Sequence, residues 1–167
     1  MLGDGGRPYP TITKEIITQM RSLASEAGVL LPNLTELCLL CGRPYPDAFP
    51  SRDFLLSCCE ELCAAGTRNV VVSGLELDGR CCSFIYAEGK ADEVWNEKVG
   101  EGRPGSGDVF AAVIAGSLLR HETLYQSVER AARFVEAAMR KTLQEQAPHA
   151  WGLCFEGRLS ELMPTAR

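Results

Sequence analysis

A short run of β-branched residues lies near the middle of the chain, where Asn69-Val70-Val71-Val72-Ser73-Gly74 follows a helical stretch that ends at Gly66. An apolar run that is this short and ends in glycine is typical of a buried strand. Residues 29–31 form a second, shorter apolar run, which Pro32 stops. Helical spacing of apolar residues alternates with these runs. We therefore expect an α/β fold with a largely parallel sheet flanked by helices.

The remaining elements follow from apolar spacing and from glycine and proline. Helices are expected at residues 11–27, 33–41, 51–65, 109–119, 123–144 and 158–163, and further strands at 81–87 and 93–99. Residues 1–10 and 42–50 are rich in glycine or proline and are expected to be loops. The helix at 109–119 is apolar nearly all round, so we expect it to be buried.

Composition excludes several classes of protein. The 167 residues have room for one domain of ordinary size or for part of a larger one, and 46% of them are hydrophobic. Lys plus Arg is 17 and Asp plus Glu is 22, a net charge of −5 that is a poor match to nucleic acid. No apolar run approaches the roughly 18 residues that span a bilayer, and the N-terminus lacks the pattern of a signal peptide. We expect a cytoplasmic protein without nucleic-acid or membrane partners.

The eight cysteines lie mostly within apolar runs: Cys38, Cys41, Cys58, Cys59, Cys63, Cys81, Cys82 and Cys154. Reduced cysteine behaves as a small buried hydrophobe, so core cysteines are favoured over disulfides or a metal site. Cys38 and Cys41 form a C-x-x-C pair, but no second pair follows and the two histidines are single and distant. A thiol or zinc protein is nevertheless an alternative.

The sharpest local signal is Gly102-Arg103-Pro104-Gly105-Ser106-Gly107-Asp108, directly before an apolar helix. Glycines let backbone amides converge on a ligand, and a helix N-terminus adds unpaired N–H groups and a positive dipole end. The amides of Gly105, Ser106 and Gly107 therefore predict an anion site suited to phosphate. Asp108 could take a proton from an attacking hydroxyl. The alternative is that Ser106 or Asp108 merely caps the helix.

Polar residues also follow the two predicted buried strands. Asn33 and Glu36 come just after the first strand and could hold a hydrated Mg²⁺ and nucleotide phosphates, because ligands of α/β sheets gather at the carboxyl ends of strands. Their spacing equally fits a capping box. Ser73, at the end of the second strand, could reach a phosphate, although a strand-ending Ser-Gly is by itself a turn. Gly3-Asp4-Gly5-Gly6 is also a turn in isolation.

The order of these motifs is more specific than any one of them. Gly-Asp-x-Gly, strand-Pro-Asn-x-x-Glu, strand-Ser-Gly and Gly-Ser-Gly-Asp-helix together resemble the C-terminal half of the ribokinase-like (PfkB-type) small-molecule kinases. Within that superfamily the chain looks most like the pyridoxal kinases. Residues 1–9, 30–37 and 105–112 carry the likeness, which extends over nearly the whole chain.

The resemblance implies a role for each motif. Asp108 matches the catalytic base, the amides of Gly105, Ser106 and Gly107 match the anion hole, and Ser73 matches a nucleotide contact. Glu36, with Asn33 beside it, matches the residue that organises Mg²⁺, partly through water, and the phosphates of ATP. The implied reaction is ATP-dependent phosphorylation of a hydroxymethyl group on a vitamin B6 vitamer such as pyridoxal. The resemblance also allows for a monovalent cation. Half of a parallel sheet leaves an unpaired strand edge and exposed apolar surface, so we expect a homodimer or aggregates.

The sequence departs from the resemblance in two respects. Leu31 stands before the Pro-Asn pair, where such kinases often have a small or hydroxylated residue. The fold of these kinases also begins well before Met1. We therefore expect residues 1–167 to be the C-terminal, ATP-side portion of a single kinase domain, without the substrate-binding and lid portion and with little activity alone. The alternatives are a hydroxymethylpyrimidine or sugar kinase of the same fold, or a catalytically silent nucleotide-binding remnant.

Overall fold

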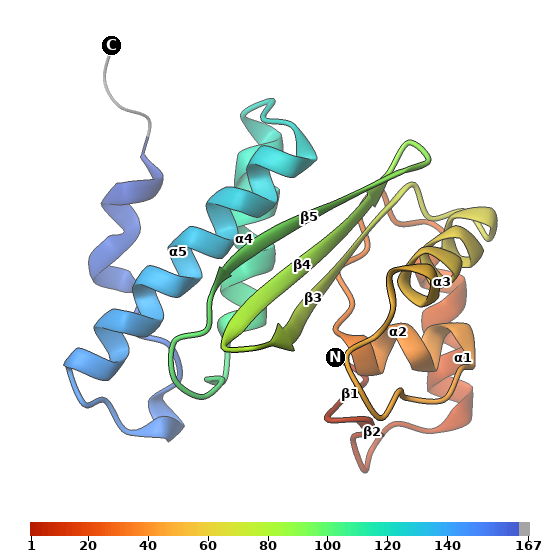
Figure 1. Cartoon of the computed structure of the whole chain (residues 1–167), viewed down its shortest axis with the longest axis horizontal. Helices are drawn as coiled ribbons and strands as arrows, with labels where there is room; N and C mark the ends of the chain where they lie inside the picture. The colour runs from red at the N-terminus through yellow and green to blue at the C-terminus, as the bar shows by residue number, and fades with distance from the viewer. Residues whose placement is uncertain (164–167) are drawn as a thin grey trace. The chain divides into compact units, whose positions relative to one another are not determined.

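The computed structural model describes residues 1–163 and divides the chain into two compact units (Figure 1). The first unit comprises residues 1–93, and the second begins at Val94. No helix among the described residues is both long enough and apolar enough to cross a membrane.

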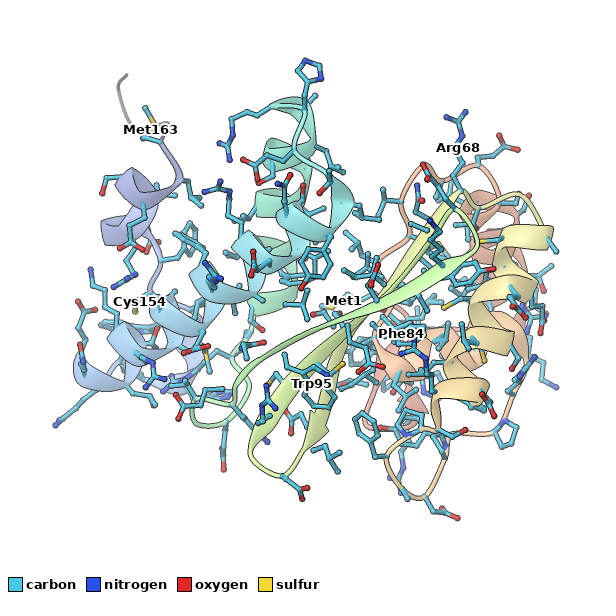
Figure 2. All side chains as sticks on the ribbon, turned by 45° about the horizontal axis from the view of Figure 1, so that its top comes forward. Met1, Arg68, Phe84, Trp95, Cys154 and Met163 are labelled. Atoms are coloured by element: carbon cyan, nitrogen blue, oxygen red, sulfur yellow. The ribbon has the colours of Figure 1, made fainter. Side chains whose placement is uncertain are left out.

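The first unit contains helices that pack against two strands. Its elements are β1 (Gly3–Asp4), β2 (Arg7–Pro8), α1 (Lys14–Ala24), α2 (Leu34–Cys41), α3 (Arg52–Ala64), β3 (Asn69–Leu77) and β4 (Arg80–Ala87). Helices α2 and α3 contact β3, and α3 also contacts β4. The side chains of Val70, Val71 and Val72 are fully buried in this core, as is Phe84 of β4 (Figure 2). The expected buried strand therefore forms the centre of the first unit.

The sheet is not organised as expected. Strands β3, β4 and β5 (Lys90–Glu97) are neighbours in that order, and β3 pairs antiparallel with β4. Two-residue turns join them, Asp78-Gly79 and Glu88-Gly89, and all four residues have positive φ, as tight hairpin turns require. Among residues 1–163, parallel pairing is found only at the isolated bridges Leu30↔Val70 and Asn33↔Ser73. The prediction of a largely parallel sheet is therefore not confirmed.

The second unit is mainly helical. After β5 it contains α4 (Ser106–Leu119), α5 (Leu124–Gln144) and the 3₁₀ helices η1 (His149–Trp151) and η2 (Glu156–Leu162). Helices α4 and α5 lie side by side (Figure 1). Ala138, Met139 and Leu153 form a buried cluster against which Val109 and Phe155 pack, so the C-terminal segment shares a core with both helices.

Three further expectations need correction. The opening residues form the β1–β2 hairpin where a loop was expected, and the final helix is 3₁₀. Helix α4 begins at Ser106 and is buried on one side only: Phe110, Val113, Ile114 and Ser117 are buried, whereas Ala112, Ala115 and Leu119 are exposed. An apolar sequence alone does not show which face of a helix finds a partner.

Candidate active site

Asn33 and Glu36 together begin helix α2. Asn33 is the N-cap residue, and its Oδ1 accepts a hydrogen bond from the backbone N–H of Glu36 at 2.8 Å. The Oε2 of Glu36 accepts in return from the backbone N–H of Asn33 at 3.0 Å. The capping-box interpretation of these two residues is therefore confirmed.

The N-terminal hairpin docks on the same turn of α2. The Oε1 of Glu36 accepts from the N–H of Leu2 at 2.7 Å, the Nδ2 of Asn33 donates to the carbonyl of Gly3 at 2.9 Å, and the N–H of Gly6 donates to the Thr35 hydroxyl at 2.9 Å. The Gly3-Asp4-Gly5-Gly6 segment is thus fixed beside Asn33 and Glu36. Sequence reasoning interpreted that segment as a turn in isolation and as one of the motifs that carry the resemblance.

Ser73 lies next to Asn33. The two residues form a parallel β-bridge, and the N–H of Ser73 donates to the carbonyl of Pro32 at 2.9 Å. A register shift between Val72 and Leu75 releases Ser73 from the antiparallel pairing with β4. The structure therefore brings together Asn33, Glu36 and Ser73, the three predicted site residues of the first unit.

The residues at α2 fit a hydrated Mg²⁺ and do not form a cage of protein ligands. Each carboxylate oxygen of Glu36 accepts one backbone N–H, which leaves it a second acceptor position. Mg²⁺ commonly keeps several waters and binds one or two carboxylates together with phosphates. Within the described part of the chain, no three His, Cys, Asp or Glu side chains are grouped to hold a metal. The zinc alternative therefore finds no support there.

The start of α4 differs from that of α2. Its N-cap is Gly105, with φ of +83°, and no side chain caps the helix. The alternative that Ser106 or Asp108 serves as the cap is therefore wrong. The N–H of Ser106 donates to the carbonyl of Arg103 at 3.2 Å, whereas the N–H groups of Gly105 and Gly107 have no partner in residues 1–163. Two of the three predicted amides are thus available to an anion.

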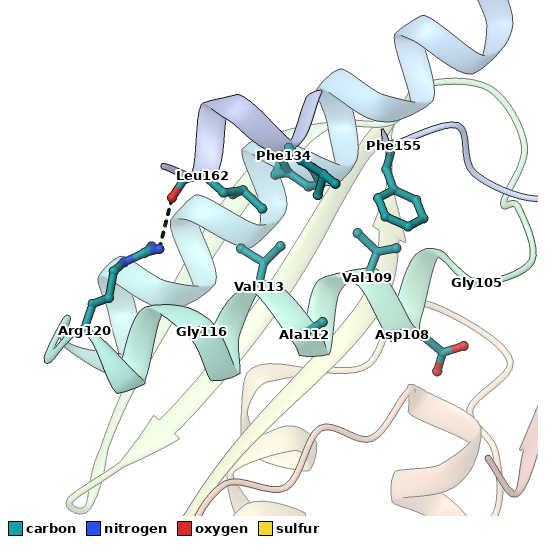
Figure 3. A pocket seen from close by; sticks show the side chains of 11 residues that line it. Gly105, Asp108, Val109, Ala112, Val113, Gly116, Arg120, Phe134, Phe155 and Leu162 are labelled. Carbon is teal, nitrogen blue, oxygen red and sulfur yellow. Dashed lines mark hydrogen bonds between the residues drawn. The ribbon is translucent and has the colours of Figure 1, made fainter. Parts of the chain in front are cut away.

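Asp108 is the third residue of α4 and is exposed. Its carboxylate makes no hydrogen bond or ion pair with any described residue. A cavity of about 460 Å³ runs along α4 from Gly105 and Asp108 to Arg120, with Phe134 and Phe155 among its lining residues (Figure 3). The start of α4 therefore combines open backbone donors, an unpaired carboxylate and a largely apolar cavity.

Arg120 borders the far end of this cavity and is held by neighbouring residues. One guanidinium nitrogen donates to the carbonyl of Leu162 at 3.0 Å (Figure 3), and the other lies 3.3 Å from the carboxylate of Glu122. Hydrogen bonds from Arg130 and then from Arg120 lower the pKa of Glu122, so this carboxylate stays charged. Arg120 is therefore a fixed positive group at the end of a mostly apolar space.

The loop before α4 is held by residues that sequence reasoning missed. Arg103 donates to the carbonyl of Ala147 at 3.0 Å, and the Nε2 of His149 lies 3.0 Å from the carbonyl oxygen of Gly102. Gly152 has φ of +74°, and a Cβ there would lie 2.6 Å from the carbonyl oxygen of Pro104. Arg103 and Ala147 are 44 residues apart in the chain, and Gly102 and His149 are 47 residues apart. No local sequence pattern could therefore have revealed these hydrogen bonds.

Known proteins resemble this chain over most of its length. Residues 6–150 match the phosphomethylpyrimidine kinase family. A hydroxymethylpyrimidine/phosphomethylpyrimidine kinase of Aquifex aeolicus (strain VF5) is 26% identical over 137 residues, which cover 73% of this chain and 52% of the relative.

Solved structures show the same fold. A Bacteroides thetaiotaomicron VPI-5482 protein, assigned as a phosphomethylpyrimidine kinase, has a TM-score of 0.92 at 29% identity over 99% of this chain and 58% of its own. The pyridoxal kinase of Lactobacillus plantarum has a TM-score of 0.87 at 28% identity over 96% and 58%. The chain thus spans little more than half the length of these relatives. It belongs to the phosphomethylpyrimidine kinase family, within the ribokinase-like superfamily.

Proposed function

We propose that this chain carries the phosphate side of a kinase that transfers the γ-phosphoryl group of ATP to a hydroxymethyl group on a vitamin B6 vitamer. The observation that carries the proposal is the start of α4. There an exposed, unpaired Asp108 adjoins the open N–H groups of Gly105 and Gly107. Phosphoryl transfer needs positioning and charge stabilisation more than covalent chemistry, and these groups can supply both.

In this mechanism Asp108 is the general base. The hydroxymethyl oxygen attacks the γ-phosphorus, the bond to the ADP oxygen breaks, and the hydroxyl proton passes to the Asp108 carboxylate. The N–H groups of Gly105 and Gly107, with the positive end of the α4 dipole, stabilise the charge on the transferring group. No side chain among residues 1–163 bonds to these donors, so a ligand can bind them without displacing a helix cap.

Glu36 would hold Mg²⁺, partly through water, with Asn33 and Ser73 beside it. When bound, Mg²⁺ neutralises charge on the phosphates of ATP. The two hydrogen bonds that Glu36 accepts from Leu2 and Asn33 fix its carboxylate in place. Because the group is fixed before any ligand arrives, it loses little conformational entropy on binding.

The cavity along α4 supports the choice of a nucleotide as phosphoryl donor. The helix rises about 18 Å between Asp108 and Arg120 at about 1.5 Å per residue, enough for an extended nucleoside triphosphate. Phe134 and Phe155 offer aromatic surface for a base. In this arrangement the nucleobase of ATP occupies the apolar cavity, and the phosphates of ATP lie at the open N–H groups of Gly105 and Gly107.

Two substrates with a hydroxymethyl group on an aromatic ring are supported by separate comparisons. One crystal form of the Bacteroides protein contains pyridoxal, and that chain is 30% identical to this one. The family match and the Aquifex relative favour hydroxymethylpyrimidine as the second candidate. A homodimer, a cytoplasmic location and a monovalent cation remain predictions.

The test is a product assay on the purified chain with ATP, Mg²⁺ and either pyridoxal or hydroxymethylpyrimidine, read by mass spectrometry. With this chain alone we expect binding of Mg-ATP by calorimetry and only slow formation of a phosphate ester of pyridoxal, because the chain spans little more than half the length of its relatives. Glu101→Gln, an exposed change outside the proposed site, is the matched control. Phosphorylation of the pyrimidine alone would select the second substrate. Binding of ATP without either product would favour the silent nucleotide-binding remnant, and no binding of ATP would overturn the proposal.

A further inference from the structure

Two thiols that the proposed reaction does not use meet between α2 and α3. Cys41 is the last residue of α2, and Cys58 lies within α3. The Sγ of Cys41 is 3.7 Å from the carbonyl oxygen of Cys58, and the two thiols are also hydrogen-bonded to each other. Cys58 is fully buried, whereas Cys41 is partly exposed. The pair therefore meets solvent on its Cys41 side.

A fixed positive charge lies beside the pair. Arg43 donates to the hydroxyl of Ser57 at 2.6 Å and to Glu61 at 2.9 Å, and its guanidinium lies 5.8 Å from the ring centroid of Phe54. Because Ser57 directly precedes Cys58 in α3, these contacts hold the guanidinium near the pair. A cation next to a thiol favours the thiolate, which is the reactive form in oxidation.

Hydrogen bonding and charge act differently on the individual cysteines. The hydrogen bond from Cys41, followed by the charge of Arg43, lowers the pKa of Cys58 against the opposing effect of burial. The same hydrogen bond raises the pKa of Cys41, so the two thiols titrate as a coupled pair. Cys38 also faces Cys58, but burial raises its pKa. Burial likewise raises the pKa of Cys59 and Cys82 to about 12, which makes them unreactive.

We propose that Cys41 and Cys58 are a redox pair that forms a reversible disulfide between α2 and α3 when the protein meets a hydroperoxide. The Cys41 thiol passes its proton to the Cys58 thiolate, and the partly exposed Cys41 sulfur attacks one oxygen of hydrogen peroxide. The O–O bond breaks, Cys41 becomes a sulfenic acid, and the hydroxide that leaves takes up a proton from solvent as the first water. The second sulfur then attacks the sulfenic sulfur, the S–S bond forms, the S–O bond breaks and a second water leaves. Two thiols lose two electrons and one peroxide is reduced to two waters.

A disulfide at Cys41 would form at the end of α2. Cys41 ends its helix, and the next residue, Gly42, has φ of +64°, so the last turn can adjust without disturbing a following helical residue. The opposite end of α2 carries Asn33 and Glu36. A disulfide would therefore tie the helix that bears these residues to α3, and it would close the loop that contains Arg43.

To test this proposal, the full chain is treated with hydrogen peroxide, and its peptides are then mapped by mass spectrometry under non-reducing conditions. We expect a peptide linked through Cys41 and Cys58, the loss of two titratable thiols, and full reversal by dithiothreitol. Cys41→Ser and Cys58→Ser should each abolish the link. Cys63→Ser, a half-buried cysteine of α3 outside the pair, should leave it unchanged. Cys41→Ala should also lack the link, and a native circular dichroism spectrum of this variant would show that the link is not lost through unfolding.

Other results would overturn the inference. A Cys38–Cys41 disulfide would mean that the C-x-x-C spacing, and not the contact between helices, determines the chemistry. Oxidation of Cys154 or Cys63 ahead of the pair would show that exposure alone governs reactivity. Sulfinic acid at Cys41 without any link would show that the two sulfurs do not meet in solution.

Discussion

Helices α2 and α4 both carry an acidic residue at the third helical position, yet they use it in opposite ways. Glu36 of α2 accepts two backbone hydrogen bonds, and Asn33 caps the helix. Asp108 of α4 has no partner among the described residues, and the cap of that helix is a glycine without a side chain. The carboxylate at the third helical position thus holds backbone N–H groups in α2 and is free of protein partners among the described residues in α4, because the N-cap residue differs.

This difference between the two N-cap residues shows how a chain can leave backbone N–H donors at a helix start unpaired, so that a ligand can bind them. An N-cap side chain satisfies one or two of the first N–H groups of a helix, and a glycine leaves them unpaired. Helix α2 is stabilised at its start by its own sequence. The start of α4 depends instead on distant contacts from Ala147, His149 and Gly152. The changes below would break or sharpen this contrast.

Asp108→Asn should have the largest effect. It keeps the size of the side chain and removes the proton acceptor, and general base catalysis typically contributes about 10²–10⁴-fold. We expect kcat to fall by about that factor, with little change in ATP affinity or thermal stability, because Asp108 caps nothing. Kinetics with calorimetry and a melting curve would check this. A lower melting temperature with unchanged kcat would mean that Asp108 is structural, as Glu36 is.

Glu36→Gln should act mainly on stability. Glutamine can accept with only one oxygen, so the N–H of either Leu2 or Asn33 loses its partner at a cost of about 1–3 kcal/mol. The loss of charge should also weaken Mg-ATP binding and make the rate depend more steeply on magnesium. Denaturant unfolding, with exposed Glu60→Gln as control, would measure the first effect. Unchanged stability would contradict the capping box seen here.

Gly105→Ala tests the open cap of α4. A Cβ at this position would meet no heavy atom within 4 Å, so the only cost is the φ of +83°. An L-residue in the left-handed region costs about 1 kcal/mol, and we expect a loss of that size in the free energy of unfolding. Gly116→Ala, within the same helix and with open space around it, should by contrast be neutral or stabilising.

Ser106→Ala should have the smallest effect. The serine hydroxyl does not cap α4, and the N–H of Ser106 is already bonded to Arg103. We expect a change within about 0.5 kcal/mol in thermal stability, as for a surface substitution. Thr123→Ala at the capping box of α5 is the informative counterpart, because it should cost about 1 kcal/mol. Equal losses for the two variants would contradict the view that α4 lacks a side-chain cap.

Local sequence signals predicted the helices well and the sheet less well. Asn33, Ser51 and Thr123 mark helix starts through their own side chains, which is why those boundaries are accurate to within a residue or two. Strand direction depends on connections. The hairpin turns at Asp78-Gly79 and Glu88-Gly89 pair neighbouring strands antiparallel, and the apolar character of β3 does not report this.

The candidate site was predictable to a similar degree. Glycine and acidic residues at helix starts pointed to Asp108 and Glu36, because the pattern is local. Whether each carboxylate is engaged or open could not be predicted, since the N–H of Leu2 that binds Glu36 is 34 residues away. The roles of Arg103, His149 and Gly152 were missed for the same reason.

The clamp on the loop before α4 has a consequence for how the protein is made. Synthesis proceeds from the N-terminus, so residues 102–105 leave the ribosome well before the segment from Ala147 to Gly152 that holds them. During that interval the helix can form while its leading loop is still unrestrained. The N-terminal end of α4 is therefore among the last parts of the nascent chain to acquire its final shape. An early stop codon or a proteolytic nick before Ala147 would remove that shape while sparing the helix.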